Sequence, residues 1–421
     1  MTRFLACFFG LMAYILVSDA YAQKTIPINF VHIGLNEGLS QSTVVDITED
    51  RQGNMWFATH NGLNKFDGYD FTVYQHNEQD AHSIGNDVIR TCITDQQGRV
   101  WAGTNAGLSL YDVDMNRFKN FSFEENGTRL EINAMVEIGH KLLLCSLKKK
   151  LLLFDTETME LSQELPVPAL SGLTPIALYK LDTDVYISSV QGLFVYSCKT
   201  NTLKNITPKE LKGKEIHAIL LQSPIRLWIG TEGYGLFRIN PLTHEVRNYT
   251  HNPQDGNSIS SNYIRSFSLD AQNNLWIGTI NSLNIYNETT DNFSIYANDP
   301  LENKSLSHAS VRDIFMDSQN GMWLGTYFGG INYYHPFQDR FSNIQLTNKE
   351  NSLNCNIIEC IREDARNNLW IGTNGGGVNC YNPRTRTFKH YTKKEGTGSD
   401  NVKVIYIDEE KDLVYIGTHT G

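Results

Sequence analysis

All six tryptophans of this chain occupy one position of a short phrase that recurs along the sequence. The phrase reads Leu-Trp-Ile-Gly-Thr at 275–279 and returns with few changes at 227–231, 322–326 and 369–373. Aligning the chain on this phrase places its second position at steps of 42 to 48 residues, at Trp56, Trp101, Leu143, Tyr186, Trp228, Trp276, Trp323, Trp370 and Tyr415. Chance would not keep six tryptophans in one register, so the chain is built from repeats.

Each repeat has the pattern of four short strands. In the unit of Trp323, an alternating segment at 311–316 leads through a turn at 317–321 into the tryptophan strand, and two further strand-like segments follow. Related turns place Gly or Asn where a positive φ is expected, at 50–54, 95–99, 270–274 and 364–368. A four-stranded unit of this period is typical of a β-propeller blade, in which aromatic side chains fill the seams between blades. The tryptophans are therefore interpreted as structural residues rather than as a ligand cage.

Nine units exceed the number of blades that one propeller holds, which is typically about four to eight. The segment 29–32 resembles the fourth strand of a unit, as at 388–391, and an N-terminal fourth strand would complete the last blade of a ring and remove a free sheet edge. We predict an all-β fold with a seven-bladed β-propeller of four-stranded antiparallel blades over residues 23–338, closed by a strand near 29–34. Residues 339–421 are predicted to be the first blades of a second propeller, and the sequence is expected to be part of a longer or truncated product because its last unit stops before the third strand.

The first 22 residues have the features of a secretory signal peptide. Arg3 precedes the apolar run 4–17, and Ala20-Tyr21-Ala22 has the small-x-small pattern of a cleavage site. We expect cleavage near Ala22 and a periplasmic location.

A formal net charge of -10 makes nucleic acid and anionic membrane surfaces poor partners.

No metal, cofactor or catalytic residue is expected. The cysteines after the signal sequence are dispersed without a CxxC pair and matching His, which favours core thiols at Cys92, Cys145, Cys360 and Cys380. The segments 244–248 and 375–377 lack the second His of a zinc protease and the helix and Lys of a phosphate loop, respectively. The regular carboxylates are turn residues of the repeat. A glycosidase or polysaccharide lyase with paired carboxylates remains an alternative, since the sequence does not give separations across blades.

Ligand-binding residues are expected where the copies differ. If the first strand of each blade runs from top to bottom, the loops after each Gly-Thr pair and the loops between units share the top face, where propellers commonly hold ligands on a rigid base. The candidates in the Gly-Thr loops are His60, Asn61, Asn105, Glu232, Tyr234, Tyr327, Phe328 and Asn374. Those in the loops between units are Asn86, Asn262, His308 and Asn356. Aromatic rings beside amides and carboxylates suit a sugar.

Two structural alternatives apply to these candidates. Asn61, Asn105 and Asn374 are each placed where an Asn could serve its turn by taking a positive φ, and this reading is favoured over ligand contact. Tyr234, Tyr327 and Phe328 are harder to explain by turn chemistry, but they could contact the second propeller instead.

The first unit resembles the two-component regulator propeller repeat. The similarity lies in 38–44, Ile47, Asp50, Gly53, 56–59, 62–68, Phe71 and Tyr74. The chain is similar to the N-terminal periplasmic sensor region of hybrid two-component systems of Bacteroidetes. The resemblance implies two seven-bladed propellers and an Ig-like domain outside the cytoplasm, followed by a membrane helix, histidine kinase, receiver and DNA-binding domain. It also implies that oligosaccharides are detected and glycan-utilisation genes controlled.

The leading hypothesis is a non-catalytic periplasmic module that binds an oligosaccharide and passes the event to a membrane-linked kinase. The alternatives are a secreted propeller that serves as a scaffold for protein binding and, with less support, a propeller enzyme acting on polysaccharide. The expected partners are the oligosaccharide, the remainder of a membrane-bound sensor kinase if the gene continues, and a second copy of the chain in a homodimer.

Overall fold

The computed structural model describes residues 28–125, 127–148, 150–162, 165, 167–181, 183–337, 344–346 and 351–421. The expected signal peptide and the expected domain boundary at 338/339 lie outside these residues. The chain divides into two compact units, Met1–Pro336 and Phe337–Gly421. Within the described residues the only helices are single 3-10 turns, and none is long and apolar enough to cross a membrane. These turns are η1 (Leu35–Glu37), η2 (Pro168–Gly172), η3 (Lys209–Leu211) and η4 (Lys393–Glu395).

The described part of the first unit contains seven four-stranded antiparallel sheets. Blade 1 contains β2 (Val44–Glu49), β3 (Met55–Thr59), β4 (Gly62–Phe66) and β5 (Phe71–Tyr74). Blade 2 contains β6 (Ile89–Thr94), β7 (Val100–Thr104), β8 (Gly107–Asp112) and β9 (Arg117–Phe121). A hairpin of β10 (Glu124–Glu125) and β11 (Thr128–Arg129) precedes blade 3, which contains β12 (Ile132–Ile138), β13 (Lys141–Ser146), β14 (Leu151–Asp155) and β15 (Glu160–Leu161).

Blades 4 to 6 repeat this order of strands. Blade 4 contains β16 (Pro175–Leu181), β17 (Asp184–Ser189), β18 (Gly192–Ser197) and β19 (Thr202–Asn205). Blade 5 contains β20 (Ile216–Ser223), β21 (Arg226–Thr231), β22 (Leu236–Ile239) and β23 (Val246–Tyr249). Blade 6 contains β24 (Ile264–Leu269), β25 (Leu275–Thr279), β26 (Leu283–Asn287) and β27 (Asn292–Tyr296).

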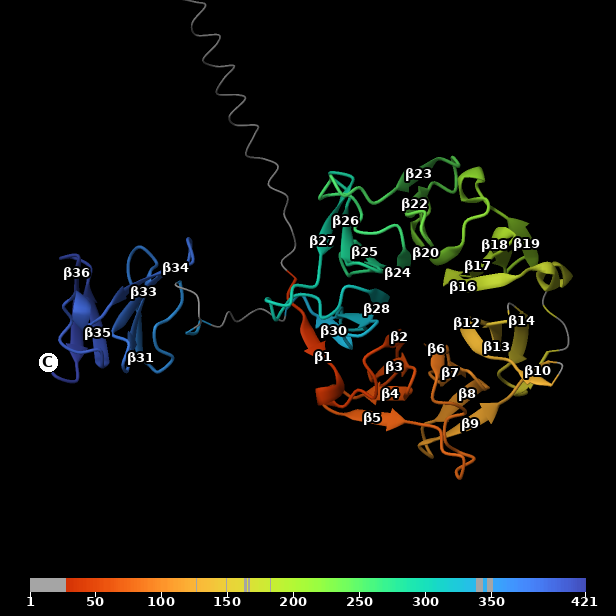
Figure 1. Ribbon diagram of the computed structural model, residues 1–421, viewed down its shortest axis with the longest axis horizontal. Helices are drawn as coiled ribbons and strands as arrows, with labels where there is room; N and C mark the ends of the chain where they lie inside the picture. The colour runs from red at the N-terminus through yellow and green to blue at the C-terminus, as the bar shows by residue number, and fades with distance from the viewer. Residues whose placement is uncertain are drawn as a thin grey trace, which may run out of the picture. The chain divides into compact units, whose positions relative to one another are not determined.

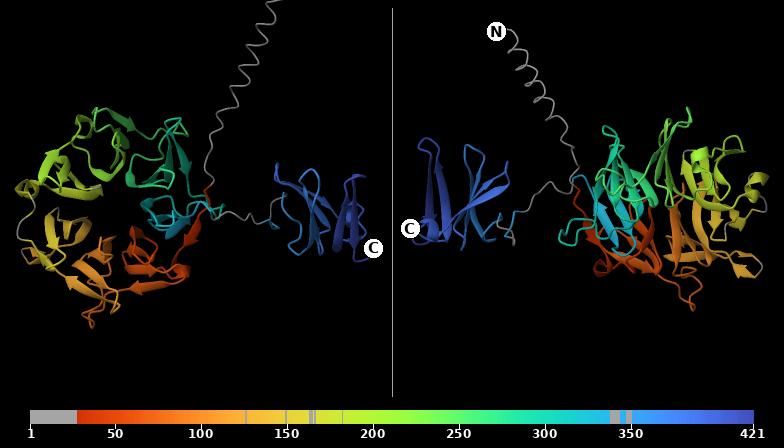
Figure 2. Two further views of the ribbon diagram at one scale, coloured as in Figure 1. Left: turned by 180° about the vertical axis from the view of Figure 1, so that it is seen from behind. Right: turned by 45° about the horizontal axis from the view of Figure 1, so that its top comes forward.

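Blade 7 takes its fourth strand from the N-terminal end of the described chain. It contains β28 (Val311–Met316), β29 (Met322–Thr326), β30 (Ile331–Tyr334) and β1 (Val31–Ile33). β1 runs antiparallel to β30, with Val31 opposite Tyr333 and Ile33 opposite Ile331. The first strands lie nearest the centre and contact one another in the closed cycle β2, β6, β12, β16, β20, β24, β28 and back to β2 (Figures 1 and 2). The predicted all-β propeller of four-stranded blades is confirmed.

Each tryptophan of the first compact unit lies in the seam between its own blade and the next blade. Trp228 packs on Tyr286 of blade 6 at a ring-centroid distance of 4.8 Å, and Trp276 packs on Tyr334 of blade 7 at 5.7 Å. Trp276 is fully buried. The indole N–H, which would be costly to bury alone, donates to the turn carboxylate six residues earlier, as from Trp276 to Asp270 at 3.0 Å. The same bond recurs in Trp56–Asp50, Trp101–Asp95, Trp323–Asp317 and Trp370–Asp364.

The other residues of the phrase also have structural roles. A Cβ on Gly278 would lie 2.5 Å from Ser266 Oγ and 3.0 Å from Val311 of the next blade, so only glycine permits this approach. The hydroxyl of Thr279 donates to the carbonyl of Ser282 at 2.9 Å and closes the following loop. The turns between first and second strands use positive φ at Gly53, Gly98, Asn273, Asn320 and Asn367, as predicted.

The second unit has the same strand pattern. β31 (Ile358–Glu363), β32 (Leu369–Thr373), β33 (Val378–Asn382) and β34 (Thr387–Tyr391) form one four-stranded antiparallel sheet. β35 (Val402–Asp408) and β36 (Leu413–Thr418) form a two-stranded sheet, and β35 packs against β31 as the first strands of neighbouring blades do in the first unit. Two neighbouring propeller blades pack in this way, and the assignment of these sheets to a second propeller stays a prediction.

Candidate functional site

A β-bulge near the top-face end of every first strand sets the centre of the candidate site. In all seven blades of the first unit the register of the first strand against the second shifts after its first residue, as between Ile89 and Thr91. A bulge leaves one residue unpaired and redirects its side chain. The bulge residues, in order of blades, are Val45, Arg90, Asn133, Ile176, His217, Arg265 and Arg312.

The residue that follows each Gly-Thr pair, or its counterpart in the degenerate blades, forms a second layer on the top face. This layer contacts the bulge residues: Asn105 accepts a hydrogen bond from Arg90 Nε at 2.8 Å. Glu232 accepts two hydrogen bonds from Arg265, at 2.7 and 3.3 Å, and the guanidinium of Arg312 lies 5.5 Å from the centre of the Tyr327 ring. The second layer consists of His60, Asn105, Leu147, Val190, Glu232, Ile280 and Tyr327.

The charges of two bulge arginines act on the third, Arg312. Burial lowers the pKa of Arg312, and the charges of Arg265 and Arg90 lower it further, opposed by Tyr327. Burial, Arg90 and Arg312 in that order also lower the pKa of His60, so this imidazole is neutral at pH 7. The blade between Arg90 and Arg312 contributes only the small apolar Val45 to the same layer.

Two bulge residues have buried polar atoms without a hydrogen-bond partner among the residues that the structure describes. They are Asn133 Oδ1 and His217 Nε2. His217 Nε2 lies 3.7 Å from a carboxylate oxygen of Glu232, which is beyond hydrogen-bond distance. Burial lowers the pKa of His217, although Glu232 acts to raise it. Buried polar groups in proteins are nearly always satisfied, so a pair in one layer requires an explanation.

Exposed aromatic rings border this layer. Tyr327 is 39% exposed, Phe328 is 60% exposed, and their ring centroids lie 4.2 Å apart. Tyr234 is 48% exposed, with the ammonium of Lys214 4.2 Å from its ring centre. Tyr263, also exposed, lies between blades 5 and 6 and forms a β-bridge with Glu232.

The structure brings some predicted site residues together and separates one of them. His60, Asn105, Glu232 and Tyr327 share the second layer, with Phe328 directly beside Tyr327. Asn374 belongs to the second unit, where its amide donates to Glu359 at 3.1 Å.

The favoured explanation for the three asparagines was wrong. None of Asn61, Asn105 and Asn374 has a positive φ, because glycines take it instead in these loops, at Gly62, Gly107 and Gly375. Asn61 anchors its turn differently, since its backbone N–H donates to Thr59 Oγ1 at 3.2 Å and its amide to the Ser40 carbonyl at 3.3 Å.

Sequence reasoning missed the bulge residues. The signal was present as Ile-Arg or Val-Arg at the start of three first strands, at 89–90, 264–265 and 311–312. Strict alternation would have paired each of these arginines within its sheet. The bulge instead leaves the arginine unpaired, and the one-residue shift moves its side chain to the other face of the sheet.

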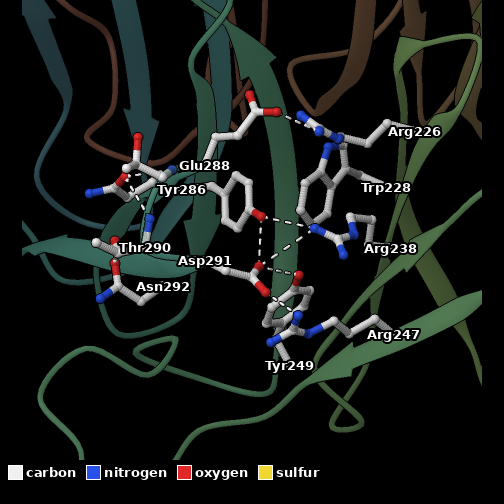
Figure 3. Close-up of polar contacts among 12 residues, drawn as sticks. Arg226, Trp228, Arg238, Arg247, Tyr249, Tyr286, Glu288, Thr290, Asp291 and Asn292 are labelled. Carbon is white, nitrogen blue, oxygen red and sulfur yellow. Dashed lines mark hydrogen bonds and ion pairs between the residues drawn. The ribbon is translucent and has the colours of Figure 1, made fainter.

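Another polar network of the first unit lies at the opposite, bottom face. Figure 3 shows Asp291 accepting hydrogen bonds from the hydroxyls of Tyr249 and Tyr286, each at 2.6 Å, beside Arg238 and Arg247. Burial acts to raise the pKa of Asp291, but the two hydroxyls and then the two arginines lower it below its ordinary value. The carboxylate is therefore ionised and fully engaged.

A neutral version of this network fastens the seam of blades 1 and 2. Asn116 accepts hydrogen bonds there from Tyr74 at 2.7 Å and from Tyr111 at 2.9 Å. Because Asn116 and Asp291 occupy corresponding turns, both with positive φ, the network is an element of the repeat rather than a separate site.

A cavity of about 790 Å³ lies along the seam of blades 4 and 5. Tyr186 stands there in place of tryptophan, and Ile239 of blade 5 occupies the position held by Tyr286 in blade 6. Two smaller side chains facing each other leave the seam unfilled. The cavity is a consequence of repeat degeneracy and lies away from the top-face layers.

A carboxyl pair lies between blades 7 and 1. Asp46 Oδ1 and Asp313 Oδ2 both accept from the backbone N–H of Ile47 at 3.0 Å, and Asp46 Oδ2 accepts from Cys92 N at 2.8 Å. Burial raises the pKa of Asp46, and burial followed by the Asp46 charge raises that of Asp313 well above its ordinary value. Backbone N–H groups of two strands hold this pair, so we interpret it as a structural element of the seam.

The described cysteines from Cys92 onward are all free thiols. Cys92 and Cys145 are buried as predicted, whereas Cys360 and Cys380 are only partly buried. His140, Asp155 and Glu157 form the one group of described residues close enough to share a metal ion. Asp155 already accepts two backbone hydrogen bonds and lies 3.7 Å from Lys141 Nζ, so this group has the character of a charged surface turn.

Comparison with known proteins finds similarity to propellers of two-component systems. The family model of the two component regulator propeller matches residues 38–61, 258–281, 305–328 and 352–375. Histidine kinase P4 of Formosa agariphila is 44% identical over 78 residues, which are 18% of this chain and 6% of that kinase. Four segments of the chain therefore match the two component regulator propeller repeat.

Its structural relatives are extracellular domains. That of the putative hybrid two component system BT3049 from B. thetaiotaomicron is 26% identical with a TM-score of 0.62, covering 93% of this chain and 58% of that chain. That of the putative hybrid two component system BT4673 from the same organism shares the fold at 21% identity and a TM-score of 0.59, covering 93% and 57%. The chain thus spans a little over half the length of these domains and resembles the N-terminal sensor region of hybrid two-component systems.

Proposed function

We propose that this chain is a ligand-sensing module of a two-component system outside the cytoplasm, and that it binds an oligosaccharide on the top face of its first unit without transforming it. The observation that carries the proposal is the second layer. Four of its seven positions carry His, Asn, Glu and Tyr and the other three carry aliphatic residues, while the adjoining Trp, Gly and Thr residues repeat for architectural reasons. A rigid base with variable loops is a common arrangement for recognition.

The chemistry of the layer suits a sugar. Tyr327 and Phe328 offer exposed rings for the apolar face of a pyranose, and Asn133, Glu232 and His217 offer groups that can bond hydroxyls. The module would pass binding on to a membrane-linked kinase and so regulate glycan utilisation. The relatives named for two-component systems and a histidine kinase support this signalling role.

Replacing Tyr327 and Phe328 together with alanine is expected to weaken saccharide binding at least tenfold without unfolding the ring, because neither side chain belongs to the buried core. Isothermal titration calorimetry with a panel of oligosaccharides measures the affinity, and a melting curve checks the fold. Tyr69→Ala is the matched control, since Tyr69 is 90% exposed in the bottom-face loop between β4 and β5. A chain that binds no saccharide of the panel would contradict the proposal and favour the scaffold alternative.

A further inference from the structure

We infer that the top face of the first unit selects acidic saccharides, with Arg90 and Arg312 binding a carboxylate or sulfate group of the ligand. This inference rests on the proposed function and narrows its ligand class.

The first argument is an excess of positive charge. Among the described residues, no carboxylate lies within ion-pair distance of Arg90 or Arg312, while Arg265 is paired with Glu232 at 2.7 Å. The charge of Arg90 nevertheless acts on Arg312, and both charges act on His60. A chain with a net charge of -10 has many acidic residues, yet none of those that the structure describes forms an ion pair with these two arginines. An anion from outside would do so.

The second argument is orientation. Asn105 engages Arg90 through Nε, which leaves both terminal nitrogens of the guanidinium available. The face of the Tyr327 ring supports the guanidinium of Arg312. Two positioned guanidinium groups can present parallel N–H donors to a carboxylate or a sulfate, the geometry in which arginine binds oxyanions most strongly.

The third argument is that the fold does not require this charge. In the second unit the corresponding bulge residues are Glu359 and Lys403, and they form an ion pair at 2.6 Å. Asn374 bonds Glu359 there as Asn105 bonds Arg90 in the first unit. The same backbone position is therefore neutralised internally in one unit and left cationic in the other.

The fourth argument separates an acidic sugar from a simple anion. The unpartnered atoms Asn133 Oδ1 and His217 Nε2 lie in the same bulge layer as the arginines. An inorganic ion would use only the guanidinium groups. A saccharide would also bond these two atoms through its hydroxyls and would pack the apolar face of its ring on Tyr327.

The test compares matched charged and neutral ligands on the whole chain by calorimetry. One arm uses oligogalacturonate and its methyl ester, and the other uses a sulfated galactan oligosaccharide and its desulfated form. We expect at least one acidic ligand to bind, its affinity to fall at least tenfold when the charge is removed, and the affinity to decrease with added salt. The arm in which affinity falls on removal of the charge shows whether the site binds a carboxylate or a sulfate.

Arg90→Gln and Arg312→Gln are each expected to reduce affinity for the acidic ligand at least tenfold. Arg117→Gln is the matched control, because Arg117 begins β9 on the bottom face of the same blade as Arg90. Binding of neutral saccharides only, or affinities within twofold after removal of the ligand charge, would overturn the inference and leave the proposed function standing. If neither kind of saccharide binds, both fail.

Discussion

Replacing Trp276 with alanine is expected to lower the free energy of unfolding by about 3 to 5 kcal/mol. The indole is fully buried in the seam of blades 6 and 7, where it packs on Tyr334 and donates to Asp270. Alanine would leave a cavity between two rigid sheets and a carboxylate without its indole donor. Chemical denaturation monitored by circular dichroism measures the loss.

Two further variants separate the contribution of the packed indole ring from that of its hydrogen bond. Trp276→Phe keeps most of the volume but removes the indole N–H, so it should cost less than Trp276→Ala. Leu301→Ala is the control for a neutral truncation, because Leu301 is 90% exposed. A Trp276→Ala protein as stable as the wild type would contradict the packing role of the repeated tryptophan.

Deleting residues 28–34 is expected to destabilise the first unit by on the order of 5 kcal/mol, since it removes the buried side chains of Phe30 and Ile33. It also removes the ladder between β1 and β30 and the bond from Phe30 N to the Lys304 carbonyl at 2.9 Å. The exposed edge of β30 would then favour aggregation. Thermal melting and light scattering measure the two effects.

A synthetic peptide of residues 28–34 should restore stability in trans by occupying the open edge. The same peptide carrying Ile33→Asp is the control and should not restore it, because residue 33 is buried against Ile331 and its neighbours. A deletion variant that melts like the intact chain would show that β1 does not hold the ring closed.

Much of the architecture could be predicted because it depends on residues that repeat. The period, the turn glycines and asparagines, and the position of Trp276 and its counterparts all follow from local chemistry that is present in nearly every copy. The cavity in the seam of blades 4 and 5 could not be predicted in this way. It arises from a pairing of Tyr186 with Ile239 that is visible only when two blades are placed side by side.

The candidate site could be predicted only in part. The loop residues Tyr327 and Glu232 stand out because they interrupt a constant phrase. Arg90 and Arg312 do not, because an arginine within a strand ordinarily points to solvent, and it takes the bulge to redirect it. They also lie at equivalent bulges of blades 2 and 7, on either side of blade 1, a relation that no local pattern contains.

The central claim is that the repeated phrase is architecture and that the ligand binds where the copies differ. Hydrogen–deuterium exchange of the whole chain, with and without a saturating saccharide from the panel, tests it most directly. The account predicts slower exchange on binding in the top-face loops at 60–62, 105–107, 232–235 and 327–330, and unchanged exchange in the bottom-face turns at 50–54 and 270–274. Protection confined to the bottom-face turns, or to the seam of blades 4 and 5, would contradict it.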